Sequence, residues 1–156
     1  MLLLTFQADN QHYAIDAGHV LEVIPIVKIR KLPGTPDFVR GILNYRGMPV
    51  PVIDITHMLS GRPSAEHLSS RIILLKYPEN GESKNVLGIL AEHATDTVVR
   101  ENKEFADSGI ASPEMPSLGK ISIGGRTMLQ IVKIDDLLTD GLKAMLFAAS
   151  PVGDSV

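Results

Sequence analysis

The fold is decided by the stretch Pro33-Gly-Thr-Pro-Asp-Phe-Val-Arg-Gly-Ile-Leu-Asn-Tyr-Arg-Gly-Met-Pro-Val-Pro-Val-Ile-Asp-Ile55. Its glycines and prolines exclude a continuous helix, since glycine is flexible and proline lacks a backbone donor. Two short strands remain, residues 41–45 and 50–54, joined by a tight turn over residues 46–49. Arg46 is a permanent cation beside Asn44 and Tyr45 among apolar neighbours, so it requires a carboxylate partner.

The residues before this stretch predict a hairpin, a short helix and a strand. Leu2, Leu4 and Phe6 alternate with other residues, and a returning strand follows at 12–15. Residues 17–24 place apolar side chains at helical spacing, with Asp16 as N-cap and Pro25 as the stop. Residues 26–32 then read as a strand with one face in solvent.

The residues after it predict mainly strands. A short helix over 55–60 is capped by Asp54 and ends at Gly61. Strands are expected at 71–77 and 85–92, with an extended continuation over 94–100, and Gly88 marks a bulge or a close backbone approach. A turn is expected at 78–81, a mobile surface loop at 101–117, a hairpin with a Gly124-Gly125 turn at 120–132, a terminal helix capped by Asp135, and a frayed tail at 151–156.

Short strands separated by turns, without crossover helices, predict a mainly β fold of small β-barrels. The chain has 156 residues and 44% hydrophobic content, enough to bury a core. We expect one domain over residues 1–150 made of two lobes, with the division in the chain near residue 70.

Charge and composition exclude several function classes. The net charge of −3 provides no basic field for nucleic acid, and aromatic residues at 4% disfavour a stacking platform. No apolar run approaches the length of a membrane span, and the apolar start of the chain is too short for a signal peptide. The absence of cysteine excludes disulfides and thiolate chemistry and suits a cytoplasmic protein.

No motif for catalysis, a metal or a cofactor is present. Neither a glycine-rich phosphate loop nor a serine in a nucleophile elbow occurs. The five histidines are not paired at ligand spacings, so structural histidines explain them better. Asp135 and Asp136 could coordinate a cation, although a helix cap with first-turn charge is the simpler explanation.

The charged pair with the clearest prediction is Glu22 and Arg46. Both lie in apolar surroundings on separate elements of the same lobe, so we expect a partly buried ion pair between them. The alternative is that each is solvated independently, in which case the contact contributes only ~0 to 1 kcal/mol. Removal of one partner of a buried pair would cost roughly 3 to 5 kcal/mol.

Three segments together resemble the CheW-like domain of bacterial chemosensory adaptors. They are Val20-Leu-Glu-Val-Ile24, the block from Pro33 to Gly47 with its N-x-R-G motif, and Val50-Pro-Val-Ile-Asp54. Residues 88–96 and 125–138 resemble later parts of the same family, so the likeness covers residues 2–147.

The resemblance implies two intertwined five-stranded SH3-like β-barrels, no enzymatic activity and no cofactor. It implies an adaptor that couples a methyl-accepting chemoreceptor to a CheA-type histidine kinase. The receptor's helical tip would enter a groove between the barrels, and the kinase regulatory domain would bind one face of the first barrel. The protein would lie in the cytoplasm beside membrane-bound receptor arrays without entering the membrane.

The resemblance also implies site residues. The receptor site would contain Val20, Glu22, Val23 and Arg46, with Leu87 and Leu90 from the second barrel, and Glu22 would pair with Arg46 beside the groove. The kinase-binding loops would contain Pro33, Pro36, Phe38 and Val39. Plain core packing would explain Val20, Val23, Phe38 and Val39 equally well.

The sequence departs from the family pattern at two places. Tyr45 replaces the usual leucine before Arg46, and Glu92 with Ala94 stands where aspartate and valine are common. These changes leave open a scaffold of a surface-sensing or pilus-type pathway in place of flagellar chemotaxis.

Two other function classes are weaker. An enzyme would have only Glu22, Arg46 and Asp54 as candidate groups in the first lobe, and no nucleophile accompanies them. A nucleic-acid-binding barrel is disfavoured by the net charge and the few aromatic residues.

Overall fold

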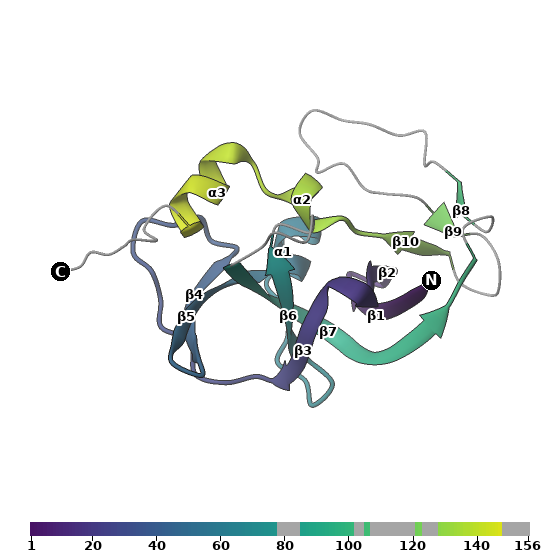
Figure 1. Cartoon of the computed structure of the whole chain (residues 1–156), viewed down its shortest axis with the longest axis horizontal. Helices are drawn as coiled ribbons and strands as arrows, with labels where there is room; N and C mark the ends of the chain where they lie inside the picture. The colour runs from purple at the N-terminus through teal and green to yellow at the C-terminus, as the bar shows by residue number, and fades with distance from the viewer. Residues whose placement is uncertain (78–84, 102–104, 107–120, 123–127, 148–156) are drawn as a thin grey trace.

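The computed structural model describes residues 1–77, 85–101, 105–106, 121–122 and 128–147. It is mainly β, and the two C-terminal helices lie along the upper side in Figure 1. The strands are β1 (Leu2–Ala8), β2 (Gln11–Asp16), β3 (Val20–Pro25), β4 (Val39–Tyr45), β5 (Met48–Asp54), β6 (Arg71–Tyr77), β7 (Asn85–Val99), β8 (Phe105–Ala106), β9 (Ile121–Ser122) and β10 (Leu129–Ile131). The helices are η1 (Ala17–His19), α1 (Ile55–Ser60), α2 (Ile134–Leu137) and α3 (Asp140–Phe147).

Strand pairing forms two lobes that share β7. In the first lobe β6 lies between β3 and the first half of β7, β5 runs parallel to that same half of β7, and β4 pairs with β5. In the second lobe the other half of β7 pairs with β1, followed by β2, β10, β9 and β8. The passage between the lobes lies at His93, where φ is +52° and the register against β1 shifts, as in a β-bulge.

The lobes do not correspond to the two halves of the chain. β6 and the start of β7 complete the lobe that β3 to β5 begin, and β10 pairs in parallel with β2 from the start of the chain. A division near residue 70 is therefore wrong as a structural boundary. The sequence suggested it because residues 61–70 form a polar connection, yet the pairing partners lie on either side of that connection.

Three hydrophobic clusters form the core, the smallest of them inside the second lobe with Leu3, Ala14, Leu129 and Ile131. The interior of the first lobe contains Leu43, Val50, Val52, Ile72, Leu74 and Leu90. The larger cluster joins the opposite face of β6 and β7 to the second lobe and to α2 and α3, through residues such as Phe6, Ile15, Ile73, Leu87 and Leu142. Because each fully buried large aliphatic side chain stabilises the fold by about 1.5 to 3 kcal/mol, the C-terminal helices cover a face that would otherwise be costly to expose.

The first lobe is closed by a backbone contact rather than by a full strand. Arg30 and Ile42 exchange two hydrogen bonds, each 2.8 Å long. Gly41 lies beside this contact with φ of +134°, and a Cβ added there would lie 2.0 Å from the carbonyl oxygen of Arg30. Glycine at position 41 thus allows the approach that closes the lobe.

Asp54 caps α1 as predicted, and it does more than that. Its side chain is 0% exposed and accepts from the backbone N–H of His57 at 3.1 Å. It also accepts from the backbone N–H and the hydroxyl of Ser64, and an Nη atom of Arg40 lies 3.8 Å away. The carboxylate therefore fixes the connection that follows α1, and the helix ends at Gly61 with φ of +80°.

Three predicted elements differ from the structure. Residues 20–25 form strand β3 rather than part of a helix, because pairing with β6 satisfies their backbone and their β-branched side chains suit a strand. Residues 26–32 contain the isolated bridge at Arg30 in place of a strand. The terminal helix begins after Lys133, not at Asp135, and is interrupted at residues 138–139, where the hydroxyl of Thr139 accepts from the N–H of Leu142.

Other predictions are confirmed. The β1–β2 hairpin, the β4–β5 pair and the helix over 55–60 are present. β9 and β10 pair as expected, and β7 includes both the strand and its continuation. Gly88 is a close approach, since a Cβ there would lie 3.0 Å from the side chain of Val52. The turn at 78–81, the Gly124-Gly125 turn, the tail at 151–156 and most of the 101–117 loop lie outside the described residues.

Candidate partner-binding surface

Strand β3 carries the residues of the predicted receptor site and directs them to two faces. Glu22 lies opposite Leu74, whose side chain is in the first-lobe interior, whereas Val23 lies opposite Ile73, whose side chain is in the larger cluster. Directly opposed residues share a face of an antiparallel sheet, so Glu22 and Val23 point in opposite directions. Val20 lies opposite Leu75 and packs against the larger cluster; it shares a face with Val23 because the register shifts by one residue between Val20 and Glu22.

Arg46 is presented by the turn between β4 and β5. Tyr45 and Met48 are paired, so Arg46 and Gly47 form a two-residue turn with φ of +51° and +84°. Positive φ at both positions is typical of the type I′ hairpin turn. The side-chain oxygen of Asn44 accepts from the N–H of Gly47 at 2.7 Å, which fixes this conformation.

The predicted contact between Glu22 and Arg46 is present, but it is not buried. Nη2 of Arg46 lies 3.3 Å from Oε1 of Glu22, and the side chains are 77% (Arg46) and 36% (Glu22) exposed. The expectation of a partly buried pair is therefore wrong. The Arg46 guanidinium also lies 5.1 Å from the centre of the Tyr45 ring, a cation–π distance.

Two predicted receptor contacts are core residues. Leu87 and Leu90 are both 0% exposed, Leu87 in the larger cluster and Leu90 inside the first lobe. They cannot touch a partner on the surface, so this prediction is wrong. Residues 86–91 of β7 form an apolar run, and only the pairing on both sides shows that neither leucine side chain reaches solvent. Val20 is half-buried and Val23 is 38% exposed.

The predicted kinase-facing residues differ in exposure. Pro33 is exposed, Pro36 is half-buried, and Phe38 is partly buried against the larger cluster. Val39 is only 7% exposed and belongs to that cluster, so its prediction as a surface contact is wrong. The carbonyl of Phe38 accepts from the N–H of Asp54 at 2.7 Å, which attaches the end of this loop to β5.

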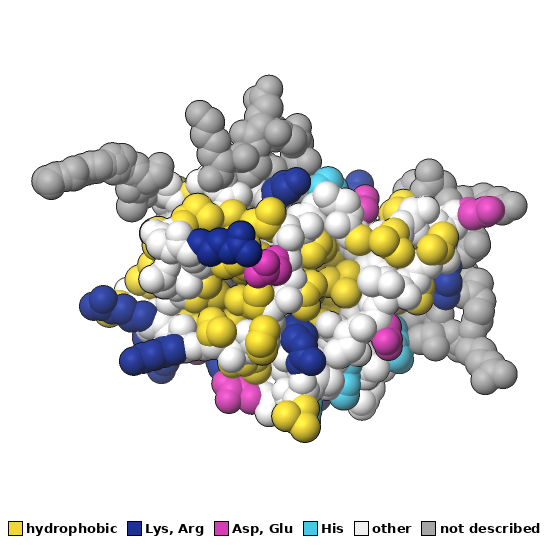
Figure 2. Space-filling model, turned by 60° about the horizontal axis from the view of Figure 1, so that its bottom comes forward, with side chains coloured by type: hydrophobic (Ala, Val, Ile, Leu, Met, Phe, Trp, Pro, Cys, Tyr) yellow, Lys and Arg dark blue, Asp and Glu magenta, His cyan; other side chains and the backbone are white. Residues whose placement is uncertain are grey.

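The structure also exposes residues that sequence reasoning did not select. Leu21, between Val20 and Glu22 in β3, is 42% exposed, and Val27, beyond the end of β3, is 41% exposed. The exposure of Leu21 follows from the alternation of half-buried and exposed residues along β3, which a helix over residues 17–24 would not produce. Figure 2 shows hydrophobic side chains interspersed with charged groups over the face that it presents.

The departures at Glu92 and Ala94 fall on a separate part of β7. Glu92 lies 3.3 Å from Nε2 of His67, and the rings of His67 and His93 stack with centres 5.6 Å apart. Ala94 is 2% exposed and belongs to the larger cluster. Position 94 therefore affects packing, and Glu92 affects a polar contact with the connection before β6.

Within the described ranges, no group of three or more His, Asp or Glu side chains is arranged to hold a metal ion. The pKa is clearly raised for two tyrosines, Tyr13 and Tyr77, in both cases chiefly by burial of the phenol. Neither belongs to the β3 or β4–β5 surface. In the same part of the chain, no helix is long and apolar enough to cross a membrane.

Comparison with known proteins identifies relatives over nearly the whole chain. Residues 2–141 match the CheW-like domain. The chain is 28% identical over 149 residues to a protein named chemotaxis protein CheW from Klebsiella aerogenes, covering 92% of this chain and 84% of that protein. It is 25% identical over 138 residues to chemotaxis protein CheW of Bacillus subtilis, covering 87% and 85% of the two chains.

The fold also matches a crystal structure. The scaffolding protein TtCheW from Thermoanaerobacter tengcongensis superposes with a TM-score of 0.80, covering 93% of this chain and 92% of that one at 24% identity. At this identity the likeness describes the fold. The predicted fold class, mainly β with two SH3-like barrels, is confirmed.

Proposed function

This chain belongs to the CheW-like domain family of chemotaxis adaptor and scaffold proteins, and we propose that it couples a methyl-accepting chemoreceptor to a CheA-type histidine kinase. It does so without chemistry of its own and without a cofactor. We place it in the cytoplasm beside the receptor array. Coupling then requires two separate binding sites on one small protein. Two weak contacts give tight binding together, because once one partner is bound the other is held at a high effective concentration.

The observation that carries the proposal is the exposed pair of Arg46 and Glu22. An ion pair in which Arg46 is 77% exposed contributes little to folding. Its value lies in recognition, because an arginine held by two neighbours loses less freedom when it binds a partner. Together with half-buried Val20 and exposed Val23, the pair provides apolar and charged groups for a helical receptor tip.

The kinase contact uses the loop before β4. Pro33 and Pro36 limit its backbone freedom, and the bonds from Val39 N–H to the Pro36 carbonyl and from Asp54 N–H to the Phe38 carbonyl attach its end to the lobe. A preorganised loop of this kind suits recognition of a folded domain, here the regulatory domain of the kinase.

A pull-down with separate partners tests the proposal. The purified protein is mixed with the tip fragment of a chemoreceptor from the same organism, or with the kinase regulatory domain. Arg46→Ala should lose the receptor tip and retain the kinase domain, and Pro33→Glu should do the reverse. Arg62→Ala is the matched control, since Arg62 is 74% exposed and pairs with Asp9 elsewhere on the surface. Failure of the folded wild-type protein to retain either partner would reject the adaptor function.

A second pathway class follows from Tyr45. The tyrosine places an aromatic face under Arg46, and a receptor of a surface-sensing or pilus-type pathway is the alternative partner. Tips from both receptor classes in the same pull-down separate the two, since one class should be retained in preference to the other.

A further inference from the structure

A pocket of about 470 Å³ lies beside the edge of β4. The residues around it include Lys28, Arg30, Ile42, Leu43, Asn44 and Pro49. Half-buried Ile42 and exposed Pro49 contribute apolar side chains. Neither Glu22 nor Arg46 belongs to the lining, although Gly47 of the turn that presents Arg46 does, so the pocket adjoins the pair that carries the proposed function.

The backbone of β4 leaves one pairing position open at this pocket. Pro49 and Pro51 lie opposite Asn44 and Ile42 and have no N–H, so these are the non-hydrogen-bonded pairs of the β4–β5 ladder. The backbone groups of Ile42 and Asn44 therefore point away from β5. Those of Ile42 bond to Arg30, whereas no strand pairs with Asn44 on that side within the described residues.

The segment that pairs with β4 at Arg30 does not continue along β4 as far as Asn44, so the pairing position at Asn44 is open. If residues 28–30 continued as an antiparallel strand, Lys28 would pair with Asn44, two residues beyond the bridge of Arg30 and Ile42. The bridge is isolated, and both Lys28 and Asn44 line the pocket instead. An added segment can thus occupy the place of the missing pair.

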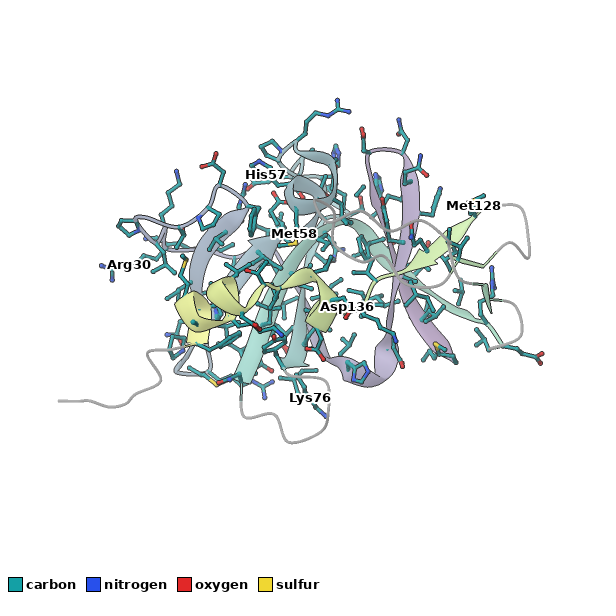
Figure 3. All side chains as sticks on the ribbon, turned by 90° about the horizontal axis from the view of Figure 1, so that it is seen from above. Arg30, His57, Met58, Lys76, Met128 and Asp136 are labelled. Atoms are coloured by element: carbon teal, nitrogen blue, oxygen red, sulfur yellow. The ribbon has the colours of Figure 1, made fainter. Side chains whose placement is uncertain are left out.

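The charges beside the pocket are both positive. Lys28 and Arg30 are exposed, and neither forms an ion pair with any described residue. Figure 3 shows Arg30 projecting outward at the end of the molecule that carries β4 and β5, where Figure 2 shows a gathering of Lys and Arg side chains. Two cations beside apolar side chains, with no carboxylate partner among the described residues, are complementary to an acidic ligand.

We propose that this pocket binds an extended acidic segment of a partner protein. The segment adds as a short strand at Asn44, places one apolar side chain against Ile42 and Pro49, and sets carboxylates against Lys28 and Arg30. Main-chain hydrogen bonds then provide affinity, and the alternation of apolar and acidic side chains provides selectivity, as in other cases of strand addition.

The test uses a fluorescein-labelled peptide of alternating glutamate and leucine with the full-length protein, followed by fluorescence anisotropy. The wild-type protein should bind it, and the double variant Lys28→Glu with Arg30→Glu should bind at least about tenfold more weakly, since attraction is replaced by repulsion. The double variant Lys76→Glu with Lys133→Glu has the same net charge and changes exposed lysines outside the pocket lining, so it should bind like wild type.

A second measurement checks the strand geometry. Hydrogen exchange at the backbone amide of Asn44, followed by NMR, should slow when the peptide is bound, and a peptide of alternating lysine and leucine should leave it unchanged. The proposal is overturned if the wild-type protein does not bind the acidic peptide, if both double variants lose binding equally, or if the Asn44 amide exchanges at the same rate with and without peptide.

Discussion

Nη2 of Arg46 lies 3.3 Å from Oε1 of Glu22, yet 77% of the Arg46 side chain remains exposed to solvent. A contact of this kind positions a charge more than it stabilises a fold. The surface role of Arg46 and its role in stability therefore separate, and mutations can measure them one at a time.

Arg46→Ala should leave folding stability almost unchanged and weaken receptor binding. Exposed ion pairs contribute ~0 to 1 kcal/mol, so the free energy of unfolding in urea should fall by less than about 1 kcal/mol. Affinity for the receptor tip should fall by about tenfold or more if Arg46 is a central contact. A large loss of stability with normal receptor binding would show that the pair is structural after all.

Tyr45→Leu should change receptor affinity, and Tyr45→Phe should not. The ring of Tyr45 lies 5.1 Å from the Arg46 guanidinium, and such a contact at an exposed site contributes about 0.5 to 1 kcal/mol. Loss of the ring should therefore alter the affinity for a given receptor tip by roughly two- to fivefold. Equal binding of the cognate tip by wild type and Tyr45→Leu, measured by calorimetry, would remove Tyr45 from the site.

Gly41→Ala should destabilise the first lobe. The added Cβ would lie 2.0 Å from the carbonyl oxygen of Arg30, and φ at this position is +134°. The cost should exceed about 1 kcal/mol, measured by urea unfolding, because the alanine fits neither the space nor the backbone. Gly141→Ala is the matched control: it lies in α3 with no atom within 4 Å of the added Cβ, so it should stabilise the protein by up to ~1 kcal/mol.

Asp54→Ala should destabilise the protein more than Asp54→Asn. The carboxylate is 0% exposed and accepts from His57 and Ser64 beside the guanidinium of Arg40. The alanine loses the cap and leaves the Ser64 donors unsatisfied, at a cost of roughly 2 to 4 kcal/mol. Asparagine keeps one acceptor, so its melting temperature should lie between those of Asp54→Ala and wild type. Equal melting temperatures for Asp54→Ala and wild type would contradict this role.

Stability should decrease at high pH through Tyr77. Its ring stacks on Phe147 and is 5% exposed, and burial raises its pKa above the ordinary value of about 10, opposed in part by Lys143. The unfolded chain then loses the phenolic proton first as pH rises. The contribution of the Tyr77 phenol to the free energy of unfolding is complete below about pH 10. It is lost above about pH 10 as pH approaches the raised pKa of Tyr77 in the folded state.

The measurement is urea unfolding at a series of pH values around 10. Tyr77→Phe should show a shallower decline than wild type, since it has no phenol to ionise. Tyr13, whose pKa burial also raises, continues to contribute in both proteins. Identical pH profiles for wild type and Tyr77→Phe would exclude Tyr77 as a source of the decline.

The sequence predicted local elements better than surfaces. Turn chemistry located the β4–β5 hairpin and the cap at Asp54, because glycine, proline and aspartate act over a few residues. The segment from Val20 to Pro25 was misread as a helix, since apolar residues at i, i+3 and i+4 also fit a strand whose register shifts. The pairing with β6, 50 residues away, decides between them.

The prediction of site residues had the same limit, because exposure depends on contacts between segments that are distant in the sequence. Glu22 and Arg46 were matched correctly, since an arginine among apolar neighbours requires a carboxylate, but the degree of exposure depends on how two distant segments close the lobe. Leu87, Leu90 and Val39 were assigned as contacts from the family resemblance, and hydrophobicity does not distinguish a core residue from an interface residue.

Strand β7 has a consequence for how the molecule transmits force. Its 15 residues run through both lobes, a length of about 50 Å at the rise of an extended strand. The bulge at His93 bends the strand, and the residues on either side of it are held in ladders, so paired backbone joins the lobes in place of a free linker. A displacement at one lobe is therefore carried to the other through the continuous backbone of β7, and the paired amides on both sides of His93 should be protected from exchange more strongly than those at the two ends of the strand.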